Sequence, residues 1–285
     1  MSHSFQYAQP RQLSEAFDIL DAYGRDASLL AGGTDLVVGL RNGRIAPRMI
    51  VDLKRISGLA PGIAETEGRI SISAPTPLTD IITDRRIQDH FPALVEAART
   101  VGSVQIRNRA TLTGNICNAS PAADTAPALL AYGAGVVLIS RRGSRLVPLE
   151  EFLLGPRRTS LGAGEIAAAV EIPKLSGRTG SRFDRLTRRR GVDLATISLC
   201  CLVGSQVTRF AYGAVGPKPF AVTDESGVLA DRESDPEARM ALLSDFVAQA
   251  TPISDLRGGR EYRQAMLLVL SQRVLRTAIA RRDRT

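Results

Sequence analysis

Two short glycine-bearing segments contain residue types that could bind a diphosphate. The first reads AGGTD over residues 31–35, where Gly32 and Gly33 are followed by Thr34. Adjacent glycines after an apolar run let the backbone turn sharply and bring bare N–H groups against an anion. Thr34 adds a hydroxyl donor, and a short helix after it would direct its positive end to the same place. A glycine turn with a helix cap at Thr34 or Asp35 explains this segment equally well.

The second segment, TLTGN over residues 111–115, has the same ingredients. Thr111 offers a hydroxyl, Gly114 a bare backbone and Asn115 an amide that can donate and accept. Two such segments could clamp one diphosphate from both sides. Neither is a GxGxxG fingerprint that opens a helix, and no GK[ST] follows a glycine-rich turn. The two common nucleotide-binding signatures are therefore absent from the sequence.

The cysteines and histidines argue against a metal centre or acid–base catalysis in this chain. Cys117, Cys200 and Cys201 form no CxxC pair and neighbour no histidine, so they lack the pattern of iron–sulfur or zinc ligands. We expect small buried thiols in a reducing compartment. The only histidines are His3 and His90, and no nucleophile–base arrangement is evident. We therefore predict no catalytic residue and no metal ligand.

The net charge of +8, from 37 basic and 29 acidic residues, suggests binding to a polyanion. Aromatic residues make up only 5% of the chain, and none interleaves with the arginine runs at 141–142 and 188–190. A solvated face, or a dock for phosphates or an acidic protein, is thus favoured over nucleic acid. No apolar stretch approaches the roughly 20 residues that span a bilayer, and the first residues lack signal-peptide features. We expect a cytoplasmic protein without a membrane span.

Strands and helices alternate around both segments. Helical and alternating apolar spacings predict helices over residues 13–20, up to 40, 78–82, 93–99 and 123–130, and strands over 27–31, 49–53, 135–139, 145–147 and 166–172. Gly24 follows the first helix as a C-terminal cap. A hairpin is predicted at Ile70 and Ile72, after turn formers Glu67 and Gly68. Residues 102–123 lack periodicity, and an irregular stretch of that length is usually functional.

The last third of the chain has a different order of elements. LSGRTGSR is a plausible linker, so we place a domain boundary near residue 178. Beyond it, strands are predicted over 182–186, 196–203 and 208–213, followed by helices over 235–250 and 259–280. Strands followed by helices indicate an α+β domain with helices on one face of a sheet.

These segments resemble the FAD-binding, or medium, subunits of the molybdenum hydroxylases. That family includes xanthine dehydrogenase, aerobic carbon monoxide dehydrogenase and the aldehyde and N-heterocycle dehydrogenases. The family's two pyrophosphate loops are similar to LLAGGTDLVVGLRNG and GSVQIRNRATLTGNICNASPAADTAPALLA. Further similar segments follow in the same order: FLLGPRRTSLGAGEI, AAAVEIP, RRRGVDLATIS, AYGAVGPKPFA and ISDLRGGREYRQAML. The resemblance therefore covers nearly the whole chain.

The resemblance implies an α+β fold with two domains. Residues 1–177 would form a PCMH-type FAD-binding domain with two subdomains, about 1–55 and 56–177. Residues 178–285 would form a smaller C-terminal domain of the CO-dehydrogenase flavoprotein type, with an antiparallel sheet and helices on one face.

The resemblance also implies which residues contact FAD. They are Leu29, Leu30, Ala31, Gly32, Gly33, Thr34, Asp35, Leu36, Val101, Thr111, Gly114, Asn115, Asp124 and Arg185. Gly32, Gly33 and Thr34 would be the main diphosphate donors, and Asp124 would accept from ribityl or adenosine hydroxyls. The chain departs from the family at Thr113, where a second glycine is usual, and at Arg185, where relatives often carry a lysine. Isolated Asn115 and Asp124 would also suit turns and helix caps, and Arg185 a surface salt bridge. Asp193 is expected near the flavin's redox partner.

The implied function is electron transfer, since FAD itself does the redox chemistry. Electrons would come from [2Fe–2S] clusters of a small subunit, fed by a large molybdopterin-binding subunit, and leave to NAD+, a quinone or O2. A dimer of heterotrimers is the family's usual assembly. Two alternatives remain open at this point. One is a stand-alone FAD-dependent oxidoreductase in a biosynthetic pathway, and the other is a basic nucleic-acid-binding protein.

Overall fold

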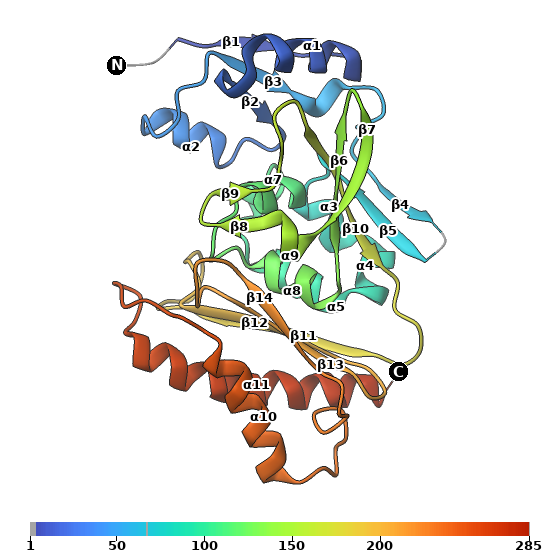
Figure 1. Cartoon of the computed structure of the whole chain (residues 1–285), viewed down its shortest axis with the longest axis vertical. Coiled ribbons are helices and arrows are strands. Elements are labelled where there is room, and N and C mark those ends of the chain that lie inside the picture. Colours follow the sequence, from blue (N-terminus) through green and yellow to red (C-terminus); the bar gives the residue numbers. More distant parts are fainter. Residues whose placement is uncertain (1–3, 67, 285) are drawn as a thin grey trace.

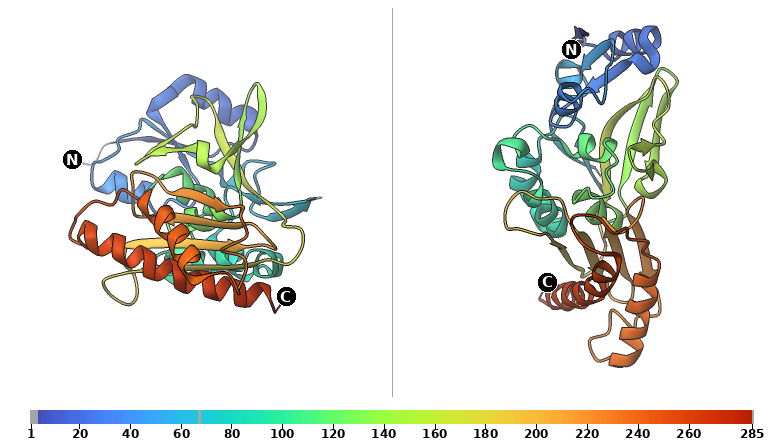
Figure 2. Two further views of the ribbon diagram at one scale, coloured as in Figure 1. Left: turned by 60° about the horizontal axis from the view of Figure 1, so that its bottom comes forward. Right: turned by 90° about the vertical axis from the view of Figure 1, so that its left-hand side faces the viewer.

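The computed structural model describes residues 4–66 and 68–284. His3 and Glu67 lie outside these described residues. Figure 1 shows three stacked parts: N-terminal strands and helices at the top, a five-stranded sheet with its helices in the middle, and a four-stranded sheet with two helices at the bottom. Figure 2 shows the same order from two other sides. The expected α+β class is confirmed.

The top part carries the first glycine segment. Its elements are β1 (Gln6–Ala8), α1 (Leu13–Tyr23), β2 (Ala27–Leu30), α2 (Leu36–Arg41) and β3 (Met49–Asp52), with 3-10 turns η1 (Gly24–Asp26) and η2 (Leu53–Arg55). The strands pair in parallel in the order β1-β3-β2. Helix α1 ends at Gly24, which has a φ of +51°, as its predicted capping role requires. Only β1, with three residues, was not predicted.

The middle part is an antiparallel sheet in the order β4-β5-β10-β6-β7. Its strands are β4 (Ile63–Thr66), β5 (Arg69–Ser73), β6 (Gly135–Ser140), β7 (Gly143–Pro148) and β10 (Ile166–Pro173). The helices beside it include α3 (Leu78–Thr83), α4 (Arg85–His90), α5 (Pro92–Thr100) and α8 (Thr125–Ala131). Every residue of α8 is buried, which fits its apolar sequence TAPALLA.

The stretch predicted to be irregular contains two helices, so that prediction was wrong in part. They are α6 (Val104–Arg107) and α7 (Leu112–Cys117). Side chains cap both helices: Ser103 accepts the Ile106 N–H and Thr111 accepts the Gly114 N–H. Helices of four and six residues are too short to show a hydrophobic period, so capping residues were their only signal in the sequence.

The bottom part confirms an antiparallel sheet with helices on one face. Its strands are β11 (Gly180–Leu186), β12 (Ile197–Val203), β13 (Thr208–Gly213) and β14 (Phe220–Asp224), and its helices are α10 (Pro236–Ala248) and α11 (Arg260–Arg282). The other face of this sheet contacts α5 and α8 of the middle part. Phe183, Cys200 and Ala211 belong to the core that those helices share. The domain boundary near residue 178 stays a prediction.

A small hairpin lies between the middle sheet and the bottom part. It consists of α9 (Leu149–Phe152), β8 (Leu153–Gly155) and β9 (Arg158–Thr159). Together with α4 and β14, these elements were not predicted, because each has only two to six residues. The hairpin nonetheless places functional candidates, as described below.

Candidate cofactor-binding site

A pocket of about 1090 Å³ lies where the three parts of the molecule meet. Ala74 and four chain segments line it, the segments within residues 20–53, 100–124, 157–167 and 189–194. Pockets of roughly 300–1000 Å³ hold drug-sized ligands. This pocket therefore has room for a ligand as large as a dinucleotide.

The first glycine segment lies between β2 and α2 with its backbone donors free. Gly33 has a φ of +79°, which glycine adopts without strain. Asp35 occupies the N-cap position of α2, but its side chain accepts no capping hydrogen bond. The backbone N–H groups of residues 32–36 donate to no acceptor in the described chain. Adjacent unbonded N–H groups form an anion-binding surface. Because the Asp35 side chain accepts none of these N–H groups, the helix-cap interpretation at Asp35 is not supported.

Gly32 joins the two glycine-bearing segments directly. A Cβ at this position would lie 2.1 Å from the carbonyl oxygen of Arg109 and 3.0 Å from the Cα of Ala110. Because these atoms belong to the backbone, a side chain at residue 32 would force the segments apart. The sequence indicated a bare approach to a ligand at Gly32, but it did not indicate this contact.

The second segment begins a helix whose cap is already occupied. Thr111 Oγ1 accepts the Gly114 N–H at 3.0 Å, so this N–H is not free for a ligand. Asn115 Oδ1 accepts a hydrogen bond from Thr125 Oγ1 at 2.7 Å. Thr113 differs from both, because its Oγ1 is buried and has no partner among the described residues. Thr113 lines the pocket and so presents a hydroxyl group without a partner.

Asp124 supplies a second unpartnered oxygen to the pocket. The residue is only 7% exposed, and its Oδ2 accepts a hydrogen bond from Arg185 Nη1 at 2.5 Å. Its Oδ1 is buried without a partner in the described chain, because the Thr100 hydroxyl, which is near enough to lower the pKa of Asp124, donates to the carbonyl oxygen of Ala97 at 2.7 Å. Burial raises the pKa of Asp124 to about 6, although the neighbouring Arg185 lowers it. An unpartnered buried acceptor is costly, and a ligand hydroxyl would satisfy it.

We expect the contribution of Asp124 to the stability of the ligand-free protein to fall as the pH rises from about 4 to about 6. The folded-state pKa of Asp124, about 6, lies above the ordinary value of 3.8. The folded chain therefore binds more protons than the unfolded chain in this window, and this stabilisation is complete below it. Urea unfolding of the wild type and of Asp124→Asn measures the effect. The wild type minus variant difference should fall by about 1–3 kcal/mol across the window. A difference that rises or stays constant contradicts the assignment.

Arg185 connects two parts of the pocket without lining it. Besides its bond to Asp124, its Nη1 donates to the carbonyl oxygen of Asp193 at 3.2 Å. Asp193 lies in the loop between β11 and β12, and its carboxylate pairs with Arg188 at 3.1 Å. The Arg188 hydrogen bond holds the pKa of Asp193 below its usual range. Arg185 forms a buried ion pair with Asp124 rather than a surface salt bridge, because its side chain is only 11% exposed.

A second network holds the first glycine segment from behind. Lys54 Nζ donates to the carbonyl oxygen of Ala31 at 3.3 Å and to Asp52 Oδ1 at 2.7 Å. Asp52 Oδ2 also accepts from Tyr7 at 2.5 Å. Burial would raise the pKa of Asp52, but the hydrogen bonds from Lys54 and Tyr7 outweigh burial and lower it. Asp52 thus stays charged and fixes Lys54 against the loop.

Most of the predicted contact residues do line the pocket. They are Leu29, Ala31, Gly32, Gly33, Thr34, Asp35, Leu36, Val101, Thr111, Gly114, Asn115 and Asp124. Leu30 and Arg185 are not among the lining residues. Asp193 also lines the pocket. Contact of any of these residues with a cofactor stays a prediction.

Sequence reasoning missed two groups of lining residues. One is the segment 161–165, which reads LGAGE and crosses from the β8–β9 hairpin to β10. Its two glycines, in the segment already similar to the family, were the available signal. The other group comprises Arg25, Arg44, Arg157 and Arg189, which give the pocket a basic lining. Arg189 belongs to the arginine run 188–190 noted in the sequence, but Arg25, Arg44 and Arg157 follow no spacing pattern that distinguished them.

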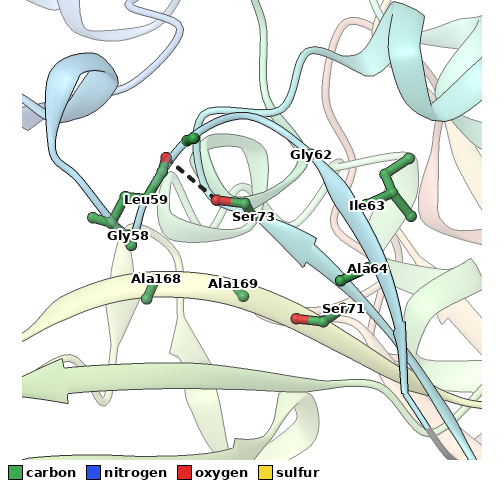
Figure 3. A pocket seen from close by; sticks show the side chains of 10 residues that line it. Gly58, Leu59, Gly62, Ile63, Ala64, Ser71, Ser73, Ala168 and Ala169 are labelled. Atoms are coloured by element: carbon green, nitrogen blue, oxygen red, sulfur yellow. Dashed lines mark hydrogen bonds between the residues drawn. The ribbon is translucent and has the colours of Figure 1, made fainter.

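A smaller depression of about 310 Å³ lies over β4, β5 and β10. Figure 3 shows its lining of small and apolar side chains, where Ser73 Oγ donates to the carbonyl oxygen of Leu59 at 3.4 Å. It has no charged side chain in its lining. In residues 4–66 and 68–284, no group of three potential metal ligands is found. In the same residues, no helix is long and apolar enough to cross a membrane.

Two family models match the chain in succession. Residues 3–175 match the model described as FAD binding domain in molybdopterin dehydrogenase. Residues 182–278 match the CO dehydrogenase flavoprotein C-terminal domain.

Curated relatives are similar over almost their whole length. The carbon monoxide dehydrogenase medium chain of Hydrogenophaga pseudoflava is 32% identical, over 97% of this chain and 98% of the relative. The xanthine dehydrogenase FAD-binding subunit of Escherichia coli O157:H7 is 31% identical, over 96% of each. Among solved structures, carbon monoxide dehydrogenase from Hydrogenophaga pseudoflava has a TM-score of 0.90 at 31% identity and covers 99% of both chains. Quinoline 2-oxidoreductase from Pseudomonas putida 86 has a TM-score of 0.88 at 28% identity, over 97% of both.

Proposed function

The chain belongs to the family of FAD-binding medium subunits of the molybdenum hydroxylases, and we propose that it passes electrons from a partner's [2Fe–2S] clusters through FAD to an external acceptor. The family resemblance expected from the sequence is confirmed. The protein is thus an oxidoreductase subunit, and its cofactor is FAD.

The pocket has unsatisfied groups of the kinds that FAD would satisfy. The unbonded N–H groups of residues 32–36 are the single observation that carries the proposal, because they suit the diphosphate. The unpartnered Oδ1 of Asp124 would accept from a ribityl or adenosine hydroxyl. Thr113 Oγ1 is a further buried polar atom without a partner in the described residues. The residues present therefore fit FAD.

The chain itself would bind, orient and shield the cofactor. When bound, FAD supplies the exchange of single electrons with clusters and of electron pairs with an acceptor. Residues 32–36 and Thr113 would hold the diphosphate, Asp124 the hydroxyls, and Arg185 the orientation of Asp124. The loop with Asp193 and exposed Val192 and Leu194 forms the rim of the pocket from the C-terminal side.

The partners would be a large molybdopterin-binding subunit and a small [2Fe–2S] subunit. Relatives carry the names medium chain and FAD-binding subunit, which denote members of multisubunit enzymes. The acceptor, which we propose to be NAD+, a quinone or O2, and the cytoplasmic location stay predictions.

Purification from the native host tests this function. We expect a yellow protein that co-elutes with two further subunits and whose spectrum contains flavin and iron–sulfur bands. A yellow protein that never associates with a large subunit would contradict the multisubunit role and favour a stand-alone flavoprotein. A colourless protein with salt-sensitive DNA binding would contradict both.

Thr113→Val should have opposite effects on the protein without FAD and on FAD binding. The substitution removes a buried, unpartnered hydroxyl group at nearly constant volume, so the apoprotein should gain about 1 kcal/mol of stability. If the hydroxyl bonds the cofactor, FAD affinity should fall by about 3- to 10-fold. Urea unfolding and fluorescence titration with FAD measure the two effects. Thr113→Gly restores the family's usual residue and serves as the comparison. Unchanged FAD affinity in both variants would mean that residue 113 does not contact the cofactor.

A further inference from the structure

We propose that Arg157, at the tip of the β8–β9 hairpin, binds the diphosphate of the cofactor from the side opposite residues 32–36. The inference rests on the proposed function and adds a binding residue to that site. Arg157 lines the pocket, and three observations together support this role.

The first observation is the backbone conformation of Arg157. Its φ is +56°, in the left-handed region that L side chains rarely adopt. The hairpin turn places Pro156 directly before it, and a turn with proline first and a positive φ second favours glycine at the second position. Arginine therefore occupies a position where glycine would be less strained. Strain of this kind in a pocket is a reason to look for a function of the side chain.

The second observation is how firmly the turn is held. The Arg157 N–H donates to the carbonyl oxygen of Ala119 at 2.9 Å. Ala119 is itself left-handed, with a φ of +46°, and is buried next to the pocket-lining Asn118 and Ser120. The turn thus cannot relax without moving the wall of the pocket. The hairpin presents the Arg157 side chain from a fixed backbone.

The third observation is that the guanidinium group is uncommitted. Within residues 4–66 and 68–284, the Arg157 side chain forms no hydrogen bond and no ion pair. The positive charge of Arg157 acts on Asp35, in the first glycine segment. Burial raises the pKa of Asp35, while Arg157 and then Arg44 lower it. Arg157 is therefore close enough to the segment of free N–H groups to act on charge there. Arg189, by contrast, already donates to the carbonyl oxygen of Val192.

A diphosphate is the ligand chemistry that fits these facts. Its two negative charges would meet bare N–H groups on one side and a planar cation with several donors on the other. A guanidinium group forms paired hydrogen bonds to phosphate oxygens that a lysine cannot copy. The positive charge would also offset the repulsion between Asp35 and the diphosphate.

Fluorescence titration of the full chain, freed of flavin, with FAD at several salt concentrations tests the inference. The variants are Arg157→Gln, Arg157→Gly and Arg157→Lys, with Arg158→Gln as the matched control. Arg158 is the next residue, is also exposed and does not line the pocket. Its substitution by Gln removes the same charge as Arg157→Gln. We expect about a tenfold loss of FAD affinity for the Gln and Gly variants at low salt, a partial loss for Lys and less than a twofold change for Arg158→Gln.

Two further readouts separate binding from folding. Arg157→Gly should unfold at a higher urea concentration than the wild type, because it relieves the left-handed strain, while binding FAD more weakly. The loss in Arg157→Gln should shrink as salt rises, as for a contact between charges. Equal affinities of Arg157→Gln and Arg158→Gln, or a loss independent of salt, would overturn the inference and leave FAD binding intact. A wild type that does not bind FAD would overturn the proposed function as well.

Discussion

Gly32→Ala should weaken FAD binding at least 100-fold and lower the stability of the protein by about 2–4 kcal/mol. The added Cβ would lie 2.1 Å from the carbonyl oxygen of Arg109, where no contact of that length is tolerated. Since the neighbouring atom belongs to the backbone, the conflict can only be relieved by separating the two glycine-bearing segments. Separation would move the free N–H groups of residues 32–36 away from Thr113 and the second segment. Isothermal titration with FAD and urea unfolding measure the two effects.

Gly62→Ala is the matched control for this substitution. Its Cβ would have no neighbour within 4 Å, and its backbone does not require a positive φ. Its stability should therefore stay within about 0.5 kcal/mol of the wild type, and its FAD affinity within about twofold. If Gly32→Ala behaved like Gly62→Ala, the close approach of the two segments would not be needed for the pocket.

Arg185→Leu should cost about 3 kcal/mol of stability and weaken FAD binding about tenfold. The substitution leaves the Asp124 carboxylate buried without its partner, because the two side chains are only 11% and 8% exposed. Loss of the cation should raise the pKa of Asp124 further above about 6, so that part of the population is protonated at neutral pH. A protonated Asp124 is a poorer acceptor for a cofactor hydroxyl. Chemical unfolding and FAD titration at neutral pH measure both quantities.

Two further variants serve as controls for Arg185→Leu. Arg141→Leu breaks an exposed ion pair with Asp18 and Asp21 and should cost less than about 1 kcal/mol. The double variant Arg185→Leu/Asp124→Asn has no buried charge at this position, so it should recover most of the lost stability but not the FAD affinity of the wild type. Equal stability of Arg185→Leu and Arg141→Leu would show that the buried pair has no special role.

Much of the secondary structure could be predicted because it has a clear hydrophobic period. Helix α11, with 23 residues, and strands such as β12 and β13 were found within a few residues of their observed ends. Some elements of two to six residues, such as α7 and β9, were missed because they span less than two periods of the pattern. Their positions depend on caps and on tertiary contacts, which a hydrophobic pattern does not record.

The site could be predicted where it consists of a local motif and not where it consists of packing. The glycines of the first segment were recognised from the sequence alone, but the contact of Gly32 with Arg109 depends on how distant segments meet. The Arg185–Asp124 pair joins residues that are 61 positions apart. Likewise, nothing in the order of residues shows that Arg157 faces the same pocket as Asp35. Long-range pairing of this kind is a property of the folded chain only.

The four-stranded sheet β11–β14 has a consequence for how the protein comes apart. One face of the sheet contacts α10 and α11, and the other shares a core with α5 and α8, so neither face is free. A chain cut between the two regions that match separate family models would expose apolar surface on both pieces. The two regions are therefore expected to unfold in a single cooperative step, and FAD would stabilise both of them although most of its pocket lies in one. The boundary between the regions that match the two family models is therefore not expected to separate two units that unfold independently.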